Sequence, residues 1–154
     1  MNETMYLLDN NVLGTLGPMR RSAAFFGARC RVPAEVAYEA RRVAYADALK
    51  PITVEMTPPM LKQLTKVMKT VPVSDNKFID LYGNKGGADP VLIAMAWALN
   101  NPDVPDLFGD RWVIVSHDKA VLAKAQEFGV DTESPEALAA FIDAAISAAG
   151  KRPV

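Results

Sequence analysis

Acidic residues stand at the ends of two apolar runs in the sequence and at the start of a third. Asp9 comes after the run YLL at residues 6–8, and Asp118 follows WVIVS after one intervening residue, His117. Asp89 begins the stretch DPVLIAMAW, in which Pro90 suits the first position of a helix. Taken singly, each acid is explained as a helix N-cap, because an Asp side chain accepts hydrogen bonds from the free N–H groups of a first turn.

A fourth acid makes a shared site plausible. Glu39 lies four residues after Glu35 in PAEVAYEA, which places the two glutamates on one face of a predicted helix. If that helix packs against the first strand, Glu39 reaches the same edge of the fold as Asp9 and Asp118. Carboxylates gathered in one small site repel one another unless a cation binds between them. Oxygen ligands without a His or Cys cluster favour Mg²⁺ or Mn²⁺ over zinc, and such an ion could assist hydrolysis of a phosphodiester.

The segments that would position these acids alternate between strand and helix patterns. Runs rich in apolar or β-branched residues predict strands at 5–8, around 31–32, at 51–56, at 111–116 and near 130. The alternation predicts an α/β sandwich with a mostly parallel sheet and helices on both faces. In such sheets, ligands bind beyond the carboxyl ends of the strands, where the strand order reverses. We therefore expect Asp9 and Asp118 at one edge of the sheet.

Helices are predicted between these strands from apolar spacing and from Pro or Gly at their ends. The segment 33–49 is expected to form one long helix that starts at Pro33. The segment 58–71 is expected to be amphipathic, with an inward face made of Leu61, Leu64, Val67 and Met68. The other helices are expected at 12–16 before a stop at Gly17-Pro18, within 22–32, at 74–84, at 88–101 after Gly86-Gly87, at 118–129 with a stop at Gly129, and at 137–150.

Composition narrows the class of protein. The chain has 154 residues, 50% of them apolar, which predicts a single domain over 1–150 with a short tail at 151–154. A net charge of −1 counts against a nucleic-acid binder, although arginines are frequent in the first third. The single cysteine, Cys30, excludes an internal disulfide and is expected in the core. No signal peptide or membrane span is predicted, so the expected location is the cytoplasm.

Four stretches carry a resemblance to a known family: YLLDNNVLG, VPAEVAYEA, GGADPVLIAMA and VIVSHD. In this order and at these spacings, they resemble the acidic motifs of PIN-domain ribonucleases, in particular the VapC-like toxin branch. The resemblance spans nearly the whole chain and implies a PIN-like fold, a three-layer α/β/α sandwich around a parallel sheet of about five strands. It also implies catalytic residues in two roles. The metal ligands would be Asp9, Glu39, Asp89 and Asp118, and the polar helpers would be Asn11 and Ser116.

The function implied by this resemblance is a Mg²⁺- or Mn²⁺-dependent endoribonuclease, a hydrolase that cuts single-stranded or loop RNA. It also implies an antitoxin protein that silences the nuclease and a second copy of the chain in a homodimer. Two departures from the family pattern bear on this. Ala120 stands where many relatives have a further acid, which implies a leaner metal site. The segment 58–86 matches no motif, so the choice of RNA is not predicted.

Two other functions stay open at this point. One is a PIN-like module that binds RNA or protein without cutting, which the near-neutral charge and Ala120 favour. The other is an Asp-nucleophile phosphatase, whose nucleophile also follows a first strand. That chemistry usually needs a second Asp two residues later, and this chain has Asn11 there.

Two further residues near the motifs allow both a functional and a structural interpretation. Glu35 is either a fifth metal ligand or an acid favoured by the dipole at the start of its helix. His117, the only histidine, is either a residue near phosphate or an exposed side chain. The adjacent Ser116, His117 and Asp118 are not interpreted as a catalytic triad, because three neighbours in sequence cannot adopt its geometry.

The basic and aromatic residues have similar alternatives. Arg41 and Arg42 are either contacts to an RNA backbone or part of a solvated helix face. Trp97 and Trp112 are expected in the core rather than as platforms for bases. The stretch GNKGG around Lys85 lacks the spacing of a phosphate-binding loop and is predicted to be a turn.

Overall fold

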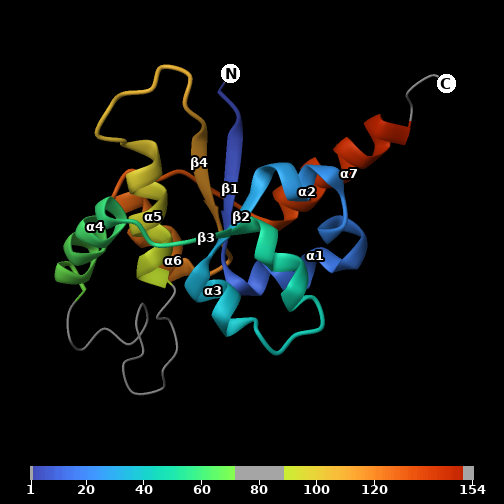
Figure 1. Cartoon of the computed structure of the whole chain (residues 1–154), viewed down its shortest axis with the longest axis horizontal. Coiled ribbons are helices and arrows are strands. Elements are labelled where there is room, and N and C mark those ends of the chain that lie inside the picture. The colour runs from blue at the N-terminus through green and yellow to red at the C-terminus, as the bar shows by residue number, and fades with distance from the viewer. Residues whose placement is uncertain (1, 72–88, 151–154) are drawn as a thin grey trace.

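A five-stranded, all-parallel sheet in the order β3-β2-β1-β4-β5 forms the centre of the molecule (Figure 1). The structure, a computed structural model, describes residues 2–71 and 89–150, with Asp89 described through its backbone alone. The α/β fold class predicted from the sequence is confirmed. The strands are β1 (Thr4–Leu8), β2 (Cys30–Pro33), β3 (Thr53–Val54), β4 (Arg111–Val115) and β5 (Thr132–Glu133).

Helices cover both faces of this sheet, which gives the three layers of an α/β/α sandwich (Figure 1). Each layer of helices has its own hydrophobic core against the sheet. One layer contains α1 (Asn10–Arg21), α2 (Ala24–Arg29), α3 (Ala34–Glu39), the 3₁₀ helix η1 (Ala46–Ile52) and α7 (Pro135–Gly150). The other layer contains α4 (Pro58–Lys69), α5 (Asp89–Asn100) and α6 (Lys119–Glu127).

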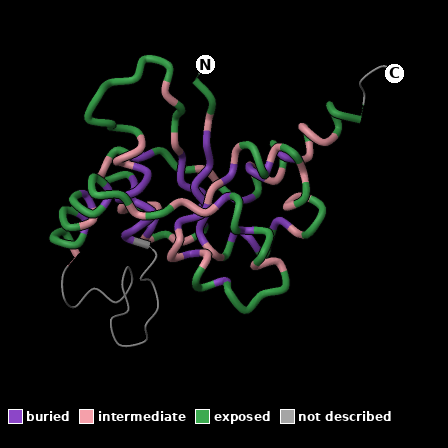
Figure 2. The backbone as a smooth tube through the Cα atoms, viewed as in Figure 1, coloured by how far each residue is buried: buried purple, intermediate pink, exposed green. Residues whose placement is uncertain are grey.

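Successive residues of the central strands supply the two cores in turn. Leu8 and Val115 pack among the helices of the first layer, while Leu7 and Ile114 pack against α4, α5 and α6. This alternation follows from the strand geometry, which points neighbouring side chains to opposite faces. Because both faces are covered, the strands are continuously apolar, and Figure 2 shows burial concentrated along them.

The order of the strands fixes where the chain reverses direction across the sheet. From β1 the chain adds β2 and then β3 on one side, and it returns to add β4 and β5 on the other. The reversal therefore falls between β1 and β4, whose last residues, Leu8 and Val115, are paired in register. A crevice for ligands forms at such a switch point, beyond the carboxyl ends of the strands. The residues that follow these two strands consequently meet there.

The long helix predicted over 33–49 is wrong. Helix α3 ends at Glu39, turns follow, and η1 begins at Ala46. The break lets Tyr45 turn back to the core, where the guanidinium of Arg21 lies 3.8 Å from the centre of its ring. Tertiary packing thus overrides the helical propensity of this Ala- and Arg-rich segment. The strand predicted at 51–56 shrinks for the same reason to the two residues of β3, because η1 continues to Ile52.

The predicted inward face of α4 is also partly wrong. Leu61 and Met68 are 53% and 39% exposed, whereas Met60, Gln63 and Val67 are buried. The apolar residues of this helix form two overlapping stripes, and the stripe through Met60 and Val67 is the one that packs with α5. The sequence therefore predicted the helix correctly, but it assigned the buried face to residues shifted by about one position along the helix.

Other predicted boundaries are close to the observed ones. Gly17, with a φ of 79°, breaks α1 as predicted, although one more turn follows it. Gly129, with a φ of 70°, ends α6, and β5 lies two residues beyond the predicted strand near 130. The helix predicted at 74–84 and the Gly86-Gly87 break lie outside the described residues. Within 2–71 and 89–150, no helix combines the length and the apolar character needed to cross a membrane.

Candidate active site at the carboxyl ends of the strands

Asp9 lies at the switch point, directly after β1, and is 7% exposed. Its backbone N–H donates to the carbonyl of Val115 at 3.2 Å, which extends the β1–β4 pairing by one residue. The Asn10 N–H donates to Asp9 Oδ1 at 2.7 Å and caps α1. The N-cap interpretation of Asp9 is therefore confirmed. This role occupies only one carboxylate oxygen.

Ser116 holds the other oxygen of Asp9. Its hydroxyl donates to Asp9 Oδ2 at 2.9 Å and accepts from the N–H of Asp118 at 3.0 Å. Because Ser116 is 2% exposed, this bridge is fixed in place between the ends of β1 and β4. Ser116 is thus positioned to orient Asp9, in keeping with the helper role predicted for it.

Asp118 combines a cap with a place beside Asp9. Its Oδ1 accepts from the N–H of Ala120 at 2.8 Å and caps α6. Its charge is also close enough to Asp9 to raise the pKa of Asp9. The capping role and membership of a cluster of acids are therefore compatible for this residue.

Glu39 approaches the same place from the end of α3. Burial raises its pKa first, and the charge of Asp9 raises it further. The sequence placed Glu39 here only on the condition that its helix packs near β1. We call Asp9, Glu39, Ser116 and Asp118 the rim.

The surroundings of the rim disfavour the ionised form of its carboxyl groups. Burial is the largest influence on Asp9 and raises its pKa, while hydrogen bonds from Ser116 and Asn10 lower it in part. Among the described residues, no Lys or Arg forms an ion pair with Asp9, Glu39 or Asp118. The rim therefore gathers carboxylates without a described side chain that balances their charge.

The residues of the rim fit a hard divalent cation in kind, because every side-chain donor is oxygen and three are carboxylates. In number they fall short: within the described part of the chain, no three Asp, Glu, His or Cys side chains stand close enough together to hold a metal ion. Asp89, the fourth predicted ligand, begins α5, and its side chain lies outside the described residues. Of the four predicted ligands, Asp9, Glu39 and Asp118 therefore lie at the rim. The place of the Asp89 side chain stays a prediction.

Two polar residues outside the rim, Asn11 and Glu35, differ in how their surroundings compare with their predicted roles. Asn11, predicted as a helper, is exposed in the first turn of α1, and its side chain makes no hydrogen bond to the described residues. Glu35, left open between ligand and dipole roles, has a buried Oε2 with no hydrogen-bond partner within 2–71 and 89–150. An unpartnered buried carboxylate oxygen is unusual and keeps Glu35 a candidate fifth ligand.

An aromatic residue next to Glu39 was missed by the sequence interpretation. Tyr38 is 66% exposed, and the guanidinium of Arg41 lies 3.9 Å from the centre of its ring. Arg41 also donates to the Tyr38 carbonyl at 2.8 Å. The signal available in the sequence was the spacing of three residues between Tyr38 and Arg41, which in the structure brings the ring and the guanidinium together across the turn that follows α3.

The remaining residues singled out in the sequence have mainly structural surroundings. His117 is exposed, and its Nε2 lies 3.2 Å from Glu136 Oε1. Trp97 and Trp112 are partly buried against the core. Cys30 is fully buried, as predicted, and burial raises its pKa to about 12. Lys85 lies outside the described residues.

No protein-family model matches this chain, and no curated protein matches it closely enough to count as a relative. The resemblance to PIN-domain ribonucleases therefore stays a prediction that depends on the four motifs and their order.

Proposed function

We propose that this protein is a metal-dependent endoribonuclease that hydrolyses phosphodiester bonds in single-stranded RNA. The observation that carries the proposal is Asp9, a buried carboxylate at the switch point of a parallel sheet with Asp118 and Glu39 near it. Asp9 accepts hydrogen bonds from two neutral donors, the Asn10 N–H and the Ser116 hydroxyl, and it forms no ion pair with a described Lys or Arg. Burial and the charge of Asp118 raise the pKa of Asp9, and a buried acid with a raised pKa in a crevice is a candidate for a functional site.

Asp9, Glu39, Asp118 and Asp89 would hold Mg²⁺ or Mn²⁺, with Glu35 as a further candidate. When bound, such an ion supplies an acidic water and balances charge on the scissile phosphate and the leaving oxygen. The chain's own residues prepare this place. Ser116 fixes the orientation of Asp9 through Oδ2, and the cap of α6 engages only Oδ1 of Asp118 among the described contacts, so that Oδ2 is open.

The test is the cleavage of a single-stranded RNA by the purified protein. We expect cleavage with Mn²⁺ or Mg²⁺ and none with EDTA. The variant Asp9→Asn should lose activity by about 100-fold or more, since it removes a charged ligand. Asp47→Asn is the matched control, because Asp47 is 94% exposed and forms an ion pair with the nearby Lys50. Full activity of Asp9→Asn, or cleavage that persists in EDTA, would contradict the proposal.

The biological role we propose is that of the toxin in a toxin–antitoxin pair, acting in the cytoplasm as a homodimer. Its support is the resemblance to the VapC-like branch alone. A small DNA-binding protein encoded just upstream would be the expected antitoxin. Its co-expression should abolish cleavage, and the two proteins should elute together in size-exclusion chromatography with light scattering. A monomer that no neighbouring gene product binds would contradict this role while leaving the nuclease proposal standing.

A module that binds RNA without cutting is the second candidate. The observation in its favour is that the described acids alone do not form a group of three metal ligands. It predicts retention of RNA in a gel-shift assay with no cleavage at any Mn²⁺ concentration. Product formation that requires the metal would exclude it.

A further inference from the structure

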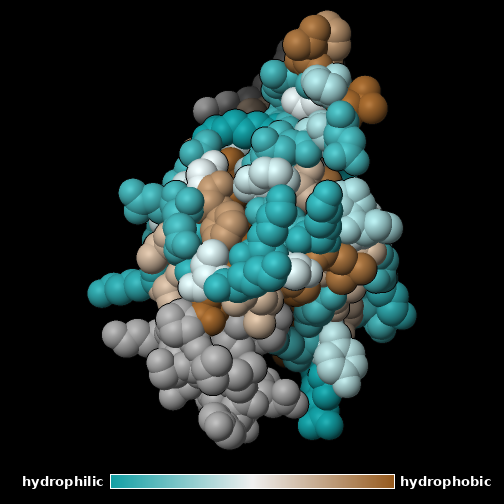
Figure 3. All heavy atoms as spheres, turned by 90° about the vertical axis from the view of Figure 1, so that its left-hand side faces the viewer, coloured by the Kyte–Doolittle hydropathy of each residue, from teal (hydrophilic) through white to brown (hydrophobic). Residues whose placement is uncertain are grey.

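A cavity of about 420 Å³ opens between α4 and α5, on the flank that faces the viewer in Figure 3. It is away from the rim along α5: the helix begins at the rim side with Asp89, and Trp97 lies about 12 Å further along its axis. Its size is in the range of small-molecule sites. The lining residues that matter chemically are Lys62, Gln63, Lys66, Trp97, Asn101 and Asp103.

Gln63 is the least expected of these residues. It is 4% exposed although it is polar, and its side-chain amide makes no hydrogen bond to the described residues. The fully buried, unpartnered side-chain atoms of the described residues do not include the amide atoms of Gln63, so this amide stays open to solvent. Gln63 lines the cavity, so its donors and its acceptor are available to whatever enters. This arrangement indicates a ligand with a polar edge.

Trp97 supplies an aromatic surface beside that amide. Part of the indole packs against the core, and the rest lines the cavity. Asn101 donates to the Trp97 carbonyl at 2.8 Å, which fixes the end of α5. The ammonium of Lys66 lies 6.0 Å from the centre of a Trp97 ring, at the outer limit of a cation–π contact. The part of the indole that lines the cavity is the surface on which a planar ligand could stack.

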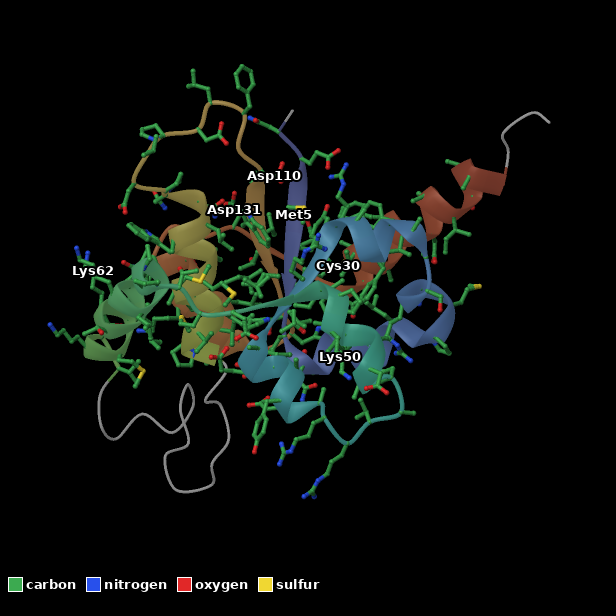
Figure 4. All side chains as sticks on the ribbon, in the orientation of Figure 1. Met5, Cys30, Lys50, Lys62, Asp110 and Asp131 are labelled. Carbon is green, nitrogen blue, oxygen red and sulfur yellow. The ribbon has the colours of Figure 1, made fainter. Side chains whose placement is uncertain are left out.

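Two lysines of α4, Lys62 and Lys66, line the cavity. Lys62 and Lys66 are four residues apart on α4, so they lie on one face, and Lys69 continues the row. Helix α4 contains no acid, and these lysines form no ion pair with the described residues. Hydrophilic side chains cover much of this flank (Figure 3), and Lys62 extends outward from α4 (Figure 4). Asp103 is the single acid among the described lining residues.

We propose that this cavity, which we call the α4–α5 cleft, binds one nucleotide of a single-stranded RNA. The base stacks on Trp97 with its polar edge at Gln63, and Lys62 and Lys66 contact the neighbouring phosphates. An aromatic platform combined with lysines is the usual way to hold a single strand. The inference rests on the proposed function, because it assigns the cleft to the same RNA that the rim cuts. A strand that engages both places must span more than the 12 Å or so of α5 between them.

The test is a fluorescence-anisotropy titration of a labelled 12-nucleotide oligo-A, performed in EDTA so that nothing is cleaved. Lys62→Glu should weaken binding roughly 5- to 10-fold and reduce the slope of log K against log salt by about 0.7, the value for one lost phosphate contact. Lys50→Glu is the matched control. It makes the same change of charge on η1, well apart from α4 (Figure 4), and should leave binding within about twofold.

A second variant guards against loss of folding. Gln63→Leu replaces a largely buried side chain, whose amide makes no hydrogen bond to the described residues, by an apolar side chain of similar size, so the fold should be retained. Its melting temperature should match or exceed that of the wild type. Its affinity for oligo-A should nevertheless fall at least about fivefold, because the contact to the base edge is gone.

Three results would overturn the inference. The first is equal weakening by Lys62→Glu and Lys50→Glu, which would mean unspecific attraction. The second is AMP binding as tightly as the oligonucleotide, which would assign the cleft to a free nucleotide. The third is a poly-glutamate peptide that binds as tightly as RNA, which would assign it to an acidic protein. Because the titration needs no catalysis, its failure and a failure of the cleavage assay are separate outcomes.

Discussion

Asp143, on α7, accepts two hydrogen bonds from the Arg20 guanidinium, at 2.8 Å from Nε and 2.9 Å from the terminal Nη2. Asp9, at the end of β1, accepts one from a backbone N–H and one from a serine hydroxyl. The hydrogen bond from Arg20 lowers the pKa of Asp143, whereas burial raises the pKa of Asp9. The same functional group is thus stabilised as an anion in one region and disfavoured as an anion in the other.

This difference separates a structural acid from a candidate functional one. Asp143 joins α7 to α1 by a bidentate pair, and its charge is balanced within the chain. Asp9 has similar hydrogen bonding but no described cation, and the charges near it are those of Glu39 and Asp118. The metal ion that we propose for the rim would supply a positive charge from outside the described chain.

The largest expected effect concerns activity. Glu39→Gln should slow RNA cleavage by on the order of 10² at saturating Mn²⁺, because it removes one of the proposed ligands. Asp143→Asn removes an acid that is paired with Arg20 and lies outside the rim. It should leave the rate within about twofold of the wild type. Single-turnover cleavage of a labelled RNA measures both. Similar rates for the two variants would mean that Glu39 does not belong to the site.

The next effect concerns how Asp9 is held. Ser116→Ala removes the hydroxyl that donates to Asp9 Oδ2 and leaves the Asp118 N–H without its acceptor. We expect a loss of about 1–3 kcal/mol in the free energy of unfolding, since both groups are then unpaired. Ser147→Ala, at an exposed position of α7, is the control and should change stability by less than about 0.5 kcal/mol. Urea denaturation compares the two, and equal stabilities would show that the bridge contributes nothing.

A smaller effect is the opposite pH dependence of the two acids in EDTA. The folded-state pKa of Asp9 is raised, so its ionisation destabilises the fold, and stability is lost as pH rises from the unfolded pKa through the folded one. Asp9→Asn should therefore match the wild type near pH 3 and exceed it at pH 7 by roughly 1 kcal/mol, or about 2–4 °C in Tm.

Asp143 should behave in the reverse way. Its folded-state pKa is lowered, so its contribution is present above the unfolded pKa and is lost as pH falls through the folded one. Asp143→Asn should be less stable than the wild type at pH 7 and equal to it at low pH. Thermal melts from pH 3 to pH 7 measure both variants. A less stable Asp9→Asn at pH 7 would contradict the difference drawn between these acids.

The sheet and the two central members of the rim could be predicted from the sequence because both depend on local patterns. Apolar runs bounded by turn residues define β1 and β4, and a residue that directly follows a parallel strand must lie at its carboxyl end. Asp9 and Ser116 meet this condition. Glu39 was a conditional prediction, because its position depends on how α3 packs.

What could not be predicted depends on contacts distant in sequence. Helix α3 stops at Glu39 because Tyr45 packs back onto the core beside Arg21, a pairing that no local pattern contains. The orientation of α4 was ambiguous because Leu61 and Met60 belong to competing apolar stripes. The α4–α5 cleft was not predicted, because no periodic pattern of apolar residues indicates that the polar Gln63 is buried.

The most direct test of the central claim is calorimetric titration of Mn²⁺ into the metal-free protein. We predict saturable uptake of at least one ion per chain by the wild type and by Asp143→Asn, and little or none by Asp9→Asn. Equal uptake by Asp9→Asn and the wild type, or no uptake by the wild type at all, would contradict the assignment of the rim as a metal site.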